Sequence, residues 1–313
     1  MTDIVGKRKW YFLFSALIIG AGLVAMGISM ARYGSPLRLG IDFTGGSLWE
    51  LTFEQPVAPA DVRQVFVDRG YGDTVVQTTL DAQTVLIRSK ELADGEKVAI
   101  QADLTTRFGA STELRFDQVG PTVGREVTRS ATMAITAAAV VIMGFIIFAW
   151  RKVPHALRYG LCATVATLHD VLVTMGAFSV LGLLLGWEAD SLFLTAMLTV
   201  TGFSVQDTIV VFDRIRENLP KRRGESYELV VNRSLLETIH RSLATQLNAI
   251  FILVAILFFG GVTIRQFVAT LLIGMISGTY SSIFTAVPLL VVWEKGEIGG
   301  VFRRLFGRAP VRA

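Results

Sequence analysis

Long apolar runs alternate along this chain with shorter polar segments. The runs at 11–30 and 131–150 contain no charged residue. Because an α-helix rises ~1.5 Å per residue, each run can cross a hydrocarbon core of about 30 Å. Similar runs follow at 159–185, 192–212, 243–260 and 267–293. The pattern predicts six transmembrane helices.

The segment 32–129 has a different pattern, in which polar and apolar residues are mixed. Alternating positions predict strands and 3.6-residue spacing predicts helices. The predicted elements are strand 46–53, helix 58–70, strands 74–80 and 84–89, helix 95–108 and strand 113–119. This β-α-β-β-α-β order predicts a small ferredoxin-like α+β domain inserted between the first two spans.

Basic residues are concentrated in alternate connections between the spans and after the last one, whereas the connections 186–191 and 261–266 contain one, Arg265. By the positive-inside rule, the basic connections and both termini face the cytoplasm. The predicted order is a cytoplasmic N-terminus (1–9), the first span (10–31), a periplasmic domain (32–129), spans two to six (130–293) and a basic cytoplasmic tail (294–313).

Composition agrees with a multi-pass membrane protein. Of 313 residues, 52% are hydrophobic and 18% charged, whereas soluble domains have roughly 25% charged residues. The net charge of +4 comes from basic residues at helix ends, so we predict no nucleic-acid surface. The single cysteine, Cys162, excludes an intramolecular disulfide and a thiolate metal cluster. No small-residue cleavage site follows the first span promptly, so we expect an uncleaved anchor.

The predicted fourth span contains a carboxylate, Asp207, about one and a half turns from its cytoplasmic end. Thr201, Ser204 and Thr208 share its side of the helix. A charged side chain in hydrocarbon costs at least ~2.5 kcal/mol and usually faces a bundle interior or a water path. We therefore expect Asp207 to have a partner.

The predicted fifth span offers that partner. Thr238, Arg241, Thr245 and Asn248 recur at helical spacing, and Arg241 lies at a depth similar to that of Asp207. We predict an ion pair between the two that forms while Asp207 is ionised and is released when Asp207 binds a proton. Proton binding would then bias two helix arrangements. Alternatively, Arg241 extends to the lipid headgroups and the pair only stabilises the fold.

Two other spans carry polar or small residues. His169 and Asp170 lie near the middle of the third span, where Thr167 and Thr174 share the face of Asp170. For His169, a hydrogen bond across the bundle and a proton relay both remain open. The sixth span has a small-residue face that predicts close helix packing, formed by Gly274, Ser277, Gly278, Ser281 and Thr285.

Two other functional classes remain as alternatives. The first is a membrane-anchored scaffold, in which the aspartates have no chemical role. An intramembrane aspartyl protease would use Asp170 and Asp207 as its acid pair, but the GxGD-type setting is missing. Zinc proteolysis is disfavoured because there is no HExxH motif and the histidines are scattered at His155, His169 and His240.

Four strings carry a family resemblance. They are GIDFTGG at 40–46, VGPTVG at 119–124, LHD at 168–170 and DTIVVFDRIREN at 207–218. They resemble the SecF family, the smaller subunits of the SecD–SecF protein-export complex. The resemblance covers nearly the whole chain, and 212–218 is its most specific string. Asn232, Ser234, Thr238 and Arg241 are similar to the next signature of the family.

The resemblance implies a fold and a set of partners. The fold would be one half of an RND-type transporter, completed by six spans of an obligate SecD partner. The complex would act beside the SecYEG channel and the SecA motor late in preprotein translocation, with YajC and YidC as further partners. The chain would lie in the bacterial inner membrane, in contact with lipid. No enzymatic activity and no cofactor are expected, and protons would be the coupling ion, with sodium as the alternative.

The polar residues in the predicted spans and the family resemblance together give the candidate site residues. Asp207 is predicted to titrate and Arg241 to respond. The supporting polar residues in the spans are His169, Asp170, Thr208, Thr238, Thr245 and Asn248. The residues carried by the family motifs are Gly40, Asp42, Gly45, Gly46, Asp213, Arg214, Arg216, Glu217 and Asn218. An RND-like lipid or drug exporter remains an alternative, and it too would need a partner.

Overall fold

The computed structural model describes residues 3–78, 83–93, 95–150, 156–222 and 224–296. The chain divides into two compact units, Leu39–Ala134 and a second unit that combines Met1–Arg38 with Ile135–Ala313. The end of the predicted strand 74–80, the basic connection 151–155 and tail residues 297–313 lie outside the described residues.

The smaller unit has the predicted order of strands and helices. Its elements are α2 (Ile41–Thr44), β1 (Gly46–Phe53), α3 (Pro59–Asp68), β2 (Val75–Thr78), β3 (Thr84–Ser89), α4 (Glu96–Phe108) and β4 (Ser111–Val119). The strands form one sheet in the order β2-β3-β1-β4, and every neighbouring pair is antiparallel. The bounds predicted for β1 and β3 are those observed.

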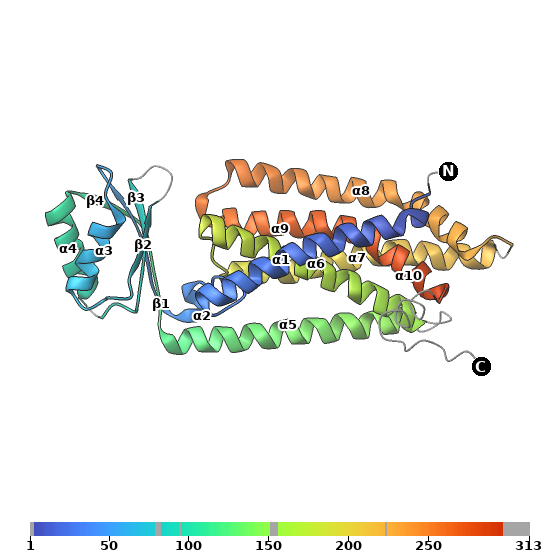
Figure 1. The fold of residues 1–313 in the computed structure, drawn as a ribbon, viewed down its shortest axis with the longest axis horizontal. Coiled ribbons are helices and arrows are strands. Elements are labelled where there is room, and N and C mark those ends of the chain that lie inside the picture. Colours follow the sequence, from blue (N-terminus) through green and yellow to red (C-terminus); the bar gives the residue numbers. More distant parts are fainter. Residues whose placement is uncertain (1–2, 79–82, 94, 151–155, 223, 297–313) are drawn as a thin grey trace, which may run out of the picture. The chain divides into compact units, whose positions relative to one another are not determined.

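Alternation along β1 explains how this sheet is covered. Trp49, Leu51 and Phe53 point to the same side and are buried against apolar residues of α3 and α4, while Glu50 and Thr52 between them are partly exposed. Both helices lie on one face of the sheet (Figure 1). Because every second residue of the strand is apolar and points to the helices, the core of this unit lies on one face of the sheet.

Two glycines at the start of β1 have backbone conformations that favour glycine. Gly45 has a φ of 72° and Gly46 a φ of 115°, a region that disfavours side chains. A Cβ on Gly46 would also lie 2.5 Å from the Ser89 carbonyl oxygen, and one on Gly124 would lie 2.9 Å from the Gly45 nitrogen. The strings 40–46 and 119–124, singled out in the sequence, therefore pack against each other.

The larger unit is a helical bundle. Its elements are the 3-10 helix η1 (Val5–Lys7), α1 (Arg8–Tyr33), α6 (Ala156–Leu185), α7 (Ser191–Lys221), α8 (Tyr227–Phe259), α9 (Val262–Ser281), the π-helix η2 (Ser282–Ala286) and α10 (Val287–Glu294). Helix α5 (Pro121–Trp150) begins in the smaller unit and ends in this one.

Five helical segments among the described residues are long and apolar enough to cross a membrane. They are Val5–Tyr33, Leu157–Leu185, Ser191–Lys221, Tyr227–Phe259 and Ile264–Glu294. Five of the six predicted spans lie on them. The remaining one, the predicted second span at 131–150, lies on α5, and its crossing of the membrane stays a prediction.

The last of these segments forms the centre of the bundle and α8 its periphery. In their apolar windows, 61% of residues are buried in Ile264–Glu294 but only 11% in α8. Cys162, on α6, is completely buried in the main apolar cluster.

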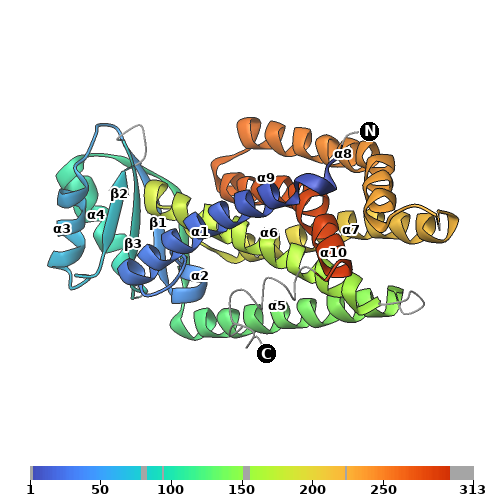
Figure 2. The same ribbon diagram turned by 45° about the vertical axis from the view of Figure 1, so that its right-hand side comes forward.

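Helices α1 and α6 lie side by side in both views (Figures 1 and 2). They approach so closely that an ideal Cβ on Gly176 would lie 2.6 Å from the Gly22 Cα. The absence of side chains at this crossing is therefore what lets the two backbones meet.

The central span changes helix type in its second half. Pro288 lies near the start of α10, and it has no N–H to donate to the carbonyl of Phe284, one turn earlier. The wider π turn of η2 covers that position. Single π turns inside α-helices are rare and often occur at functional sites.

Candidate functional site

Asp207 faces the interior of the bundle. It lies on α7, which packs against α8, and it is only 7% exposed. Its Oδ2 accepts a hydrogen bond from Nε2 of Gln246 on α8. Ser204 and Thr208 are buried on the same helix, and Thr208 Oγ1 donates to the Ser204 carbonyl at 3.0 Å. The sequence therefore placed Asp207 and Thr208 on the correct side of this helix.

The predicted ion pair between Asp207 and Arg241 is not formed in this structure. Arg241 is exposed on α8, and no ion pair among the described residues includes it. Thr245 and Asn248 are exposed as well, while Thr238 is buried. The predicted common face was wrong because the inward stripe of α8 recurs every four residues and diverges from the stripe that contains Arg241.

Gln246 and Ser242 are not among the residues predicted from the sequence. Both lie on the inward stripe of α8 together with Ser234 and Thr238, at a constant spacing of four residues, and all of them are buried. A single uncharged glutamine in an apolar run does not indicate a functional site. The repeat of polar residues at every fourth position, however, indicates a buried polar face of the helix. The amide of Gln246 takes the place next to Asp207 that we had predicted for Arg241.

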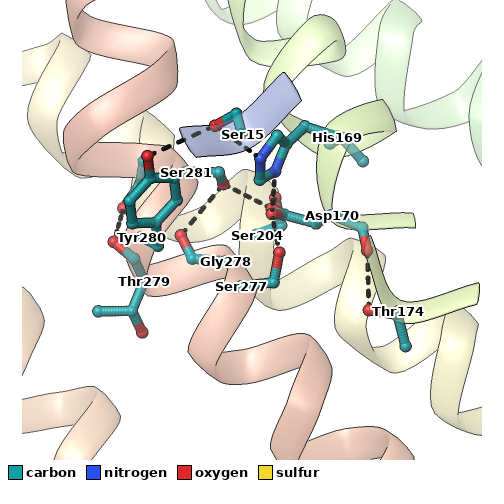
Figure 3. A network of polar contacts seen from close by, with 12 residues as sticks. Ser15, His169, Asp170, Thr174, Ser204, Ser277, Gly278, Thr279, Tyr280 and Ser281 are labelled. Carbon is teal, nitrogen blue, oxygen red and sulfur yellow. Dashed lines mark hydrogen bonds and ion pairs between the residues drawn. The ribbon is translucent and has the colours of Figure 1, made fainter. Parts of the chain in front are cut away.

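Asp170 is the centre of a second polar network, shown in Figure 3. The carboxylate is fully buried. Its Oδ2 accepts hydrogen bonds from the hydroxyls of Ser204 and Ser281, both at 2.6 Å, and its Oδ1 accepts one from Ser277 at 2.7 Å. These donors come from α7 and α9, so one side chain of α6 holds three helices together. Part of the small-residue face predicted for the sixth span thus serves hydrogen bonding as well as packing.

His169 extends this network to α1. Its Nδ1 lies 3.0 Å from Asp170 Oδ1 and its Nε2 lies 3.0 Å from the Ser15 hydroxyl. The ring of Tyr280 stacks on that of His169 at a centroid distance of 6.0 Å, and its hydroxyl donates to the Tyr11 carbonyl. A hydrogen bond across the bundle, one of the two interpretations left open by the sequence, is therefore observed.

The family-motif residues near the end of α7 form polar contacts within this helix and with α8. Asn218 Nδ2 donates to Ser234 Oγ and to Glu237 Oε2, each at 2.9 Å. Arg214 pairs with Glu237 at 2.6 Å and with Glu217 at 2.9 Å. Asp213 and Arg216 form a further pair at 2.6 Å. Asn218 and Arg214 therefore join α7 to α8, whereas the pair of Asp213 and Arg216 lies within α7.

The first family motif has a structural place too. Gly40 precedes the short helix α2, whose first turn contains Asp42, and Gly45 ends it. No group of three or more His, Cys, Asp or Glu side chains that could hold a metal ion occurs among the residues described.

Comparison with known proteins identifies the family. Residues 100–296 match the family model of the protein export membrane protein SecD/SecF, C-terminal, and residues 34–57 match that of the SecD/SecF GG motif. The second match contains the Gly45–Gly46 turn. The two matches therefore cover both units of the chain.

Two relatives that match over nearly the whole of both chains belong to the same family. The chain is 50% identical to the protein translocase subunit SecF of Thermobaculum terrenum over 97% of its own length and 98% of the relative's. It is 45% identical to that of Anaerolinea thermophila, with 100% of both chains covered.

Solved structures agree as well. The crystal structure of SecDF from Thermus, a translocon-associated membrane protein, matches 94% of this chain at a TM-score of 0.80 and 30% identity. SecDF in its super-membrane-facing form matches with a TM-score of 0.65 and 28% identity. This chain spans 39% and 40% of those longer chains. The chain therefore belongs to the SecF family of protein translocase subunits.

Proposed function

We propose that this chain works with a SecD subunit to assist protein export through the SecYEG channel after the SecA motor has engaged the preprotein. In this proposal, protons moving down their gradient drive the late steps of translocation. The smaller unit is the periplasmic ferredoxin-like domain, and both termini are cytoplasmic in the bacterial inner membrane. YajC and YidC are further partners.

One observation carries the proposal: a buried carboxylate in a candidate membrane span is paired with an uncharged amide. Asp207 has Gln246 as its hydrogen-bond partner and no cation in contact among the described residues. A charge in a membrane is costly and usually marks an ion path or a proton relay. Asp207 is therefore suited to exchange a proton with little rearrangement of its surroundings.

The exposed side of α8 supports the need for a partner. Arg241, Thr245 and Asn248 are exposed on a helix long and apolar enough to cross a membrane. Polar residues in membrane helices usually face other helices or a water-filled cavity rather than lipid. In the assembled complex, SecD would cover this side and bring Arg241 within reach of a carboxylate.

The geometry does not favour an intramembrane aspartyl protease. Such enzymes need two carboxylates that share one proton. Here Asp170 is hydrogen-bonded by serine hydroxyls and His169, whereas Asp207 is hydrogen-bonded by Gln246. The two carboxylates have separate partners.

The test is an Asp207→Asn variant reconstituted with SecD in vesicles that contain the export channel. We expect the stimulation of preprotein completion by a proton gradient to fall at least tenfold, because asparagine cannot exchange a proton. Asp190→Asn is the matched control, since it removes a carboxylate from the same helix but asparagine still caps it. Undiminished stimulation in Asp207→Asn would refute the proposal, and stimulation by a sodium gradient instead would reassign the coupling ion.

A further inference from the structure

Two buried polar atoms on the inward stripe of α8 have no hydrogen-bond partner among the described residues. They are Oε1 of Gln246 and Oγ of Ser242, whose side chains are 3% and 4% exposed. The two residues are four positions apart, so their side chains lie on the same face, one turn from each other. Buried polar atoms nearly always have a partner, and each exception calls for an explanation.

The nitrogen of the Gln246 amide, unlike its oxygen, has a hydrogen-bond partner. Its Nε2 donates to Oδ2 of Asp207. An ionised carboxylate can only accept hydrogen bonds, so it must face the N–H end of the amide. A protonated carboxyl group has an O–H to donate, and it would then need an acceptor.

Gln246 can serve both states of Asp207. If its amide turns by half a rotation, Oε1 faces Asp207 and accepts the hydrogen bond of the protonated acid. Nε2 then takes the place that Oε1 had, and the nearest unpartnered polar side chain on this stripe is Ser242, one turn earlier. A hydroxyl both donates and accepts, so Ser242, through a bridging water, suits either end of the amide.

We propose that Gln246 is the positioning residue of the proton site at Asp207. Its amide donates to the ionised carboxylate and, after rotation, accepts from the protonated acid, while Ser242 provides the hydrogen-bond partner on the far side. The proton that arrives stays on Asp207, so no other covalent bond changes. The value of this switch for export rests on the proposed function, but the switch itself is a property of the α7–α8 pair.

The surrounding charged and titratable groups leave this role to Gln246. From α6, Asp170 interacts electrostatically with Asp207, and it is held by its own serine donors. From α9, Tyr280 donates to the Tyr11 carbonyl. On α8 itself, His240 and Arg241 are exposed. No cation among the described residues contacts Asp207, so its hydrogen-bond partner alone must adapt to the proton.

Infrared difference spectra between low and high pH test this inference on the complex with SecD in lipid. The acid C=O band of Asp207 is identified by its loss in Asp207→Asn. In the wild type, we expect a glutamine side-chain amide band to change with the same pH midpoint. Gln246→Met should remove the amide band and shift the acid band to higher wavenumber. Gln206→Met is the matched control, because Gln206 neighbours Asp207 in sequence but is exposed, and it should change neither band.

A second variant keeps the test decisive if Gln246→Met does not assemble with SecD. Ser242→Ala retains the amide and should shift the glutamine band while the acid band remains. The inference is overturned if both bands are unchanged in these variants, or if the amide band responds to sodium chloride and not to pH. Either result would leave the loss of the acid band in Asp207→Asn, and hence the proposed function, intact.

Discussion

Two buried carboxylates of the bundle are solvated in opposite ways. Asp170 accepts hydrogen bonds from three serine hydroxyls, and a histidine nitrogen lies within bonding distance. Asp207 accepts one from an amide. A carboxylate with a full set of donors from several helices is a structural tie, because any change of its state would disturb them all. The single, rotatable partner of Asp207 leaves it free to change state.

Charge made Asp207 easy to predict from sequence, and lack of charge concealed Gln246. An aspartate in an apolar run is expensive enough to demand a reason, whereas a glutamine is common and neutral. Arg241 was correctly seen as unusual, but its side of α8 depends on which neighbours cover the helix. The chain alone does not contain those neighbours, so its sequence could not show what Arg241 faces.

The surface ion pairs of the smaller unit predict an acid-sensitive fold. A hydrogen bond from Arg69, at 2.7 Å, lowers the pKa of Asp103, and hydrogen bonds from Gln64 and Arg107 lower that of Asp68. A carboxyl group with a depressed folded-state pKa stabilises the fold above its unfolded value of about 3.9 and loses that contribution as pH falls.

We therefore expect amide hydrogen exchange in 46–119 of the intact chain to accelerate between about pH 4 and pH 2, the range below the unfolded value. Asp103→Asn should reduce this acceleration, because it removes one of the groups that must be protonated. Glu54→Gln is the control, since Glu54 is exposed and forms no ion pair among the described residues. An identical pH response in wild type and Asp103→Asn would contradict this explanation.

At the scale of elements, alternation and length were reliable guides. Strands β1 and β3 begin and end where predicted because a sheet covered on one face imposes a strict period of two. Helix α8 contains the predicted span at 243 and extends back to Tyr227, and Ser234 in this additional part hydrogen-bonds to Asn218 of α7. Apolar length predicts where a helix can cross a membrane but not where the helix begins.

The close crossing of α1 and α6 gives a prediction at this scale. A Cβ on Gly22 would lie 2.9 Å from the Gly176 Cα, whereas one on Gly27 of the same helix meets nothing within 4 Å. Gly22→Ala should therefore destabilise the bundle by about 1–3 kcal/mol, the usual cost of overpacking. Thermal unfolding in detergent measures the effect, and Gly27→Ala should be neutral or slightly stabilising. Equal melting temperatures for the two variants would show that the helices can move apart freely.

At the scale of the whole molecule, the chain leaves one of its helices largely uncovered. Only 11% of the apolar window of α8 is buried, and its outer side includes polar residues. The chain spans 39% of the SecDF structure that it matches at a TM-score of 0.80. The fold is thus similar to part of a longer chain, and the exposed polar side of α8 is where we expect a SecD subunit to bind.

Cysteine accessibility can test this expectation. Thr245→Cys on α8 should react with a membrane-permeant maleimide in the chain alone and be protected at least fivefold when SecD is present. Leu17→Cys is the control, because Leu17 is 64% exposed on α1 among other exposed apolar residues. If SecD protected both positions equally, or neither, α8 would not be the contact surface.

The buried position of Cys162 makes such labelling simple. Thiol reagents need an exposed thiolate, and the side chain of this residue, the only cysteine in the sequence, is completely enclosed by the main apolar cluster. Probes for fluorescence or spin-label distance measurements can therefore be introduced one at a time into the natural sequence. Since no cysteine-free variant has to be made first, the packing of α6 stays as nature built it while the motions of the other helices are recorded.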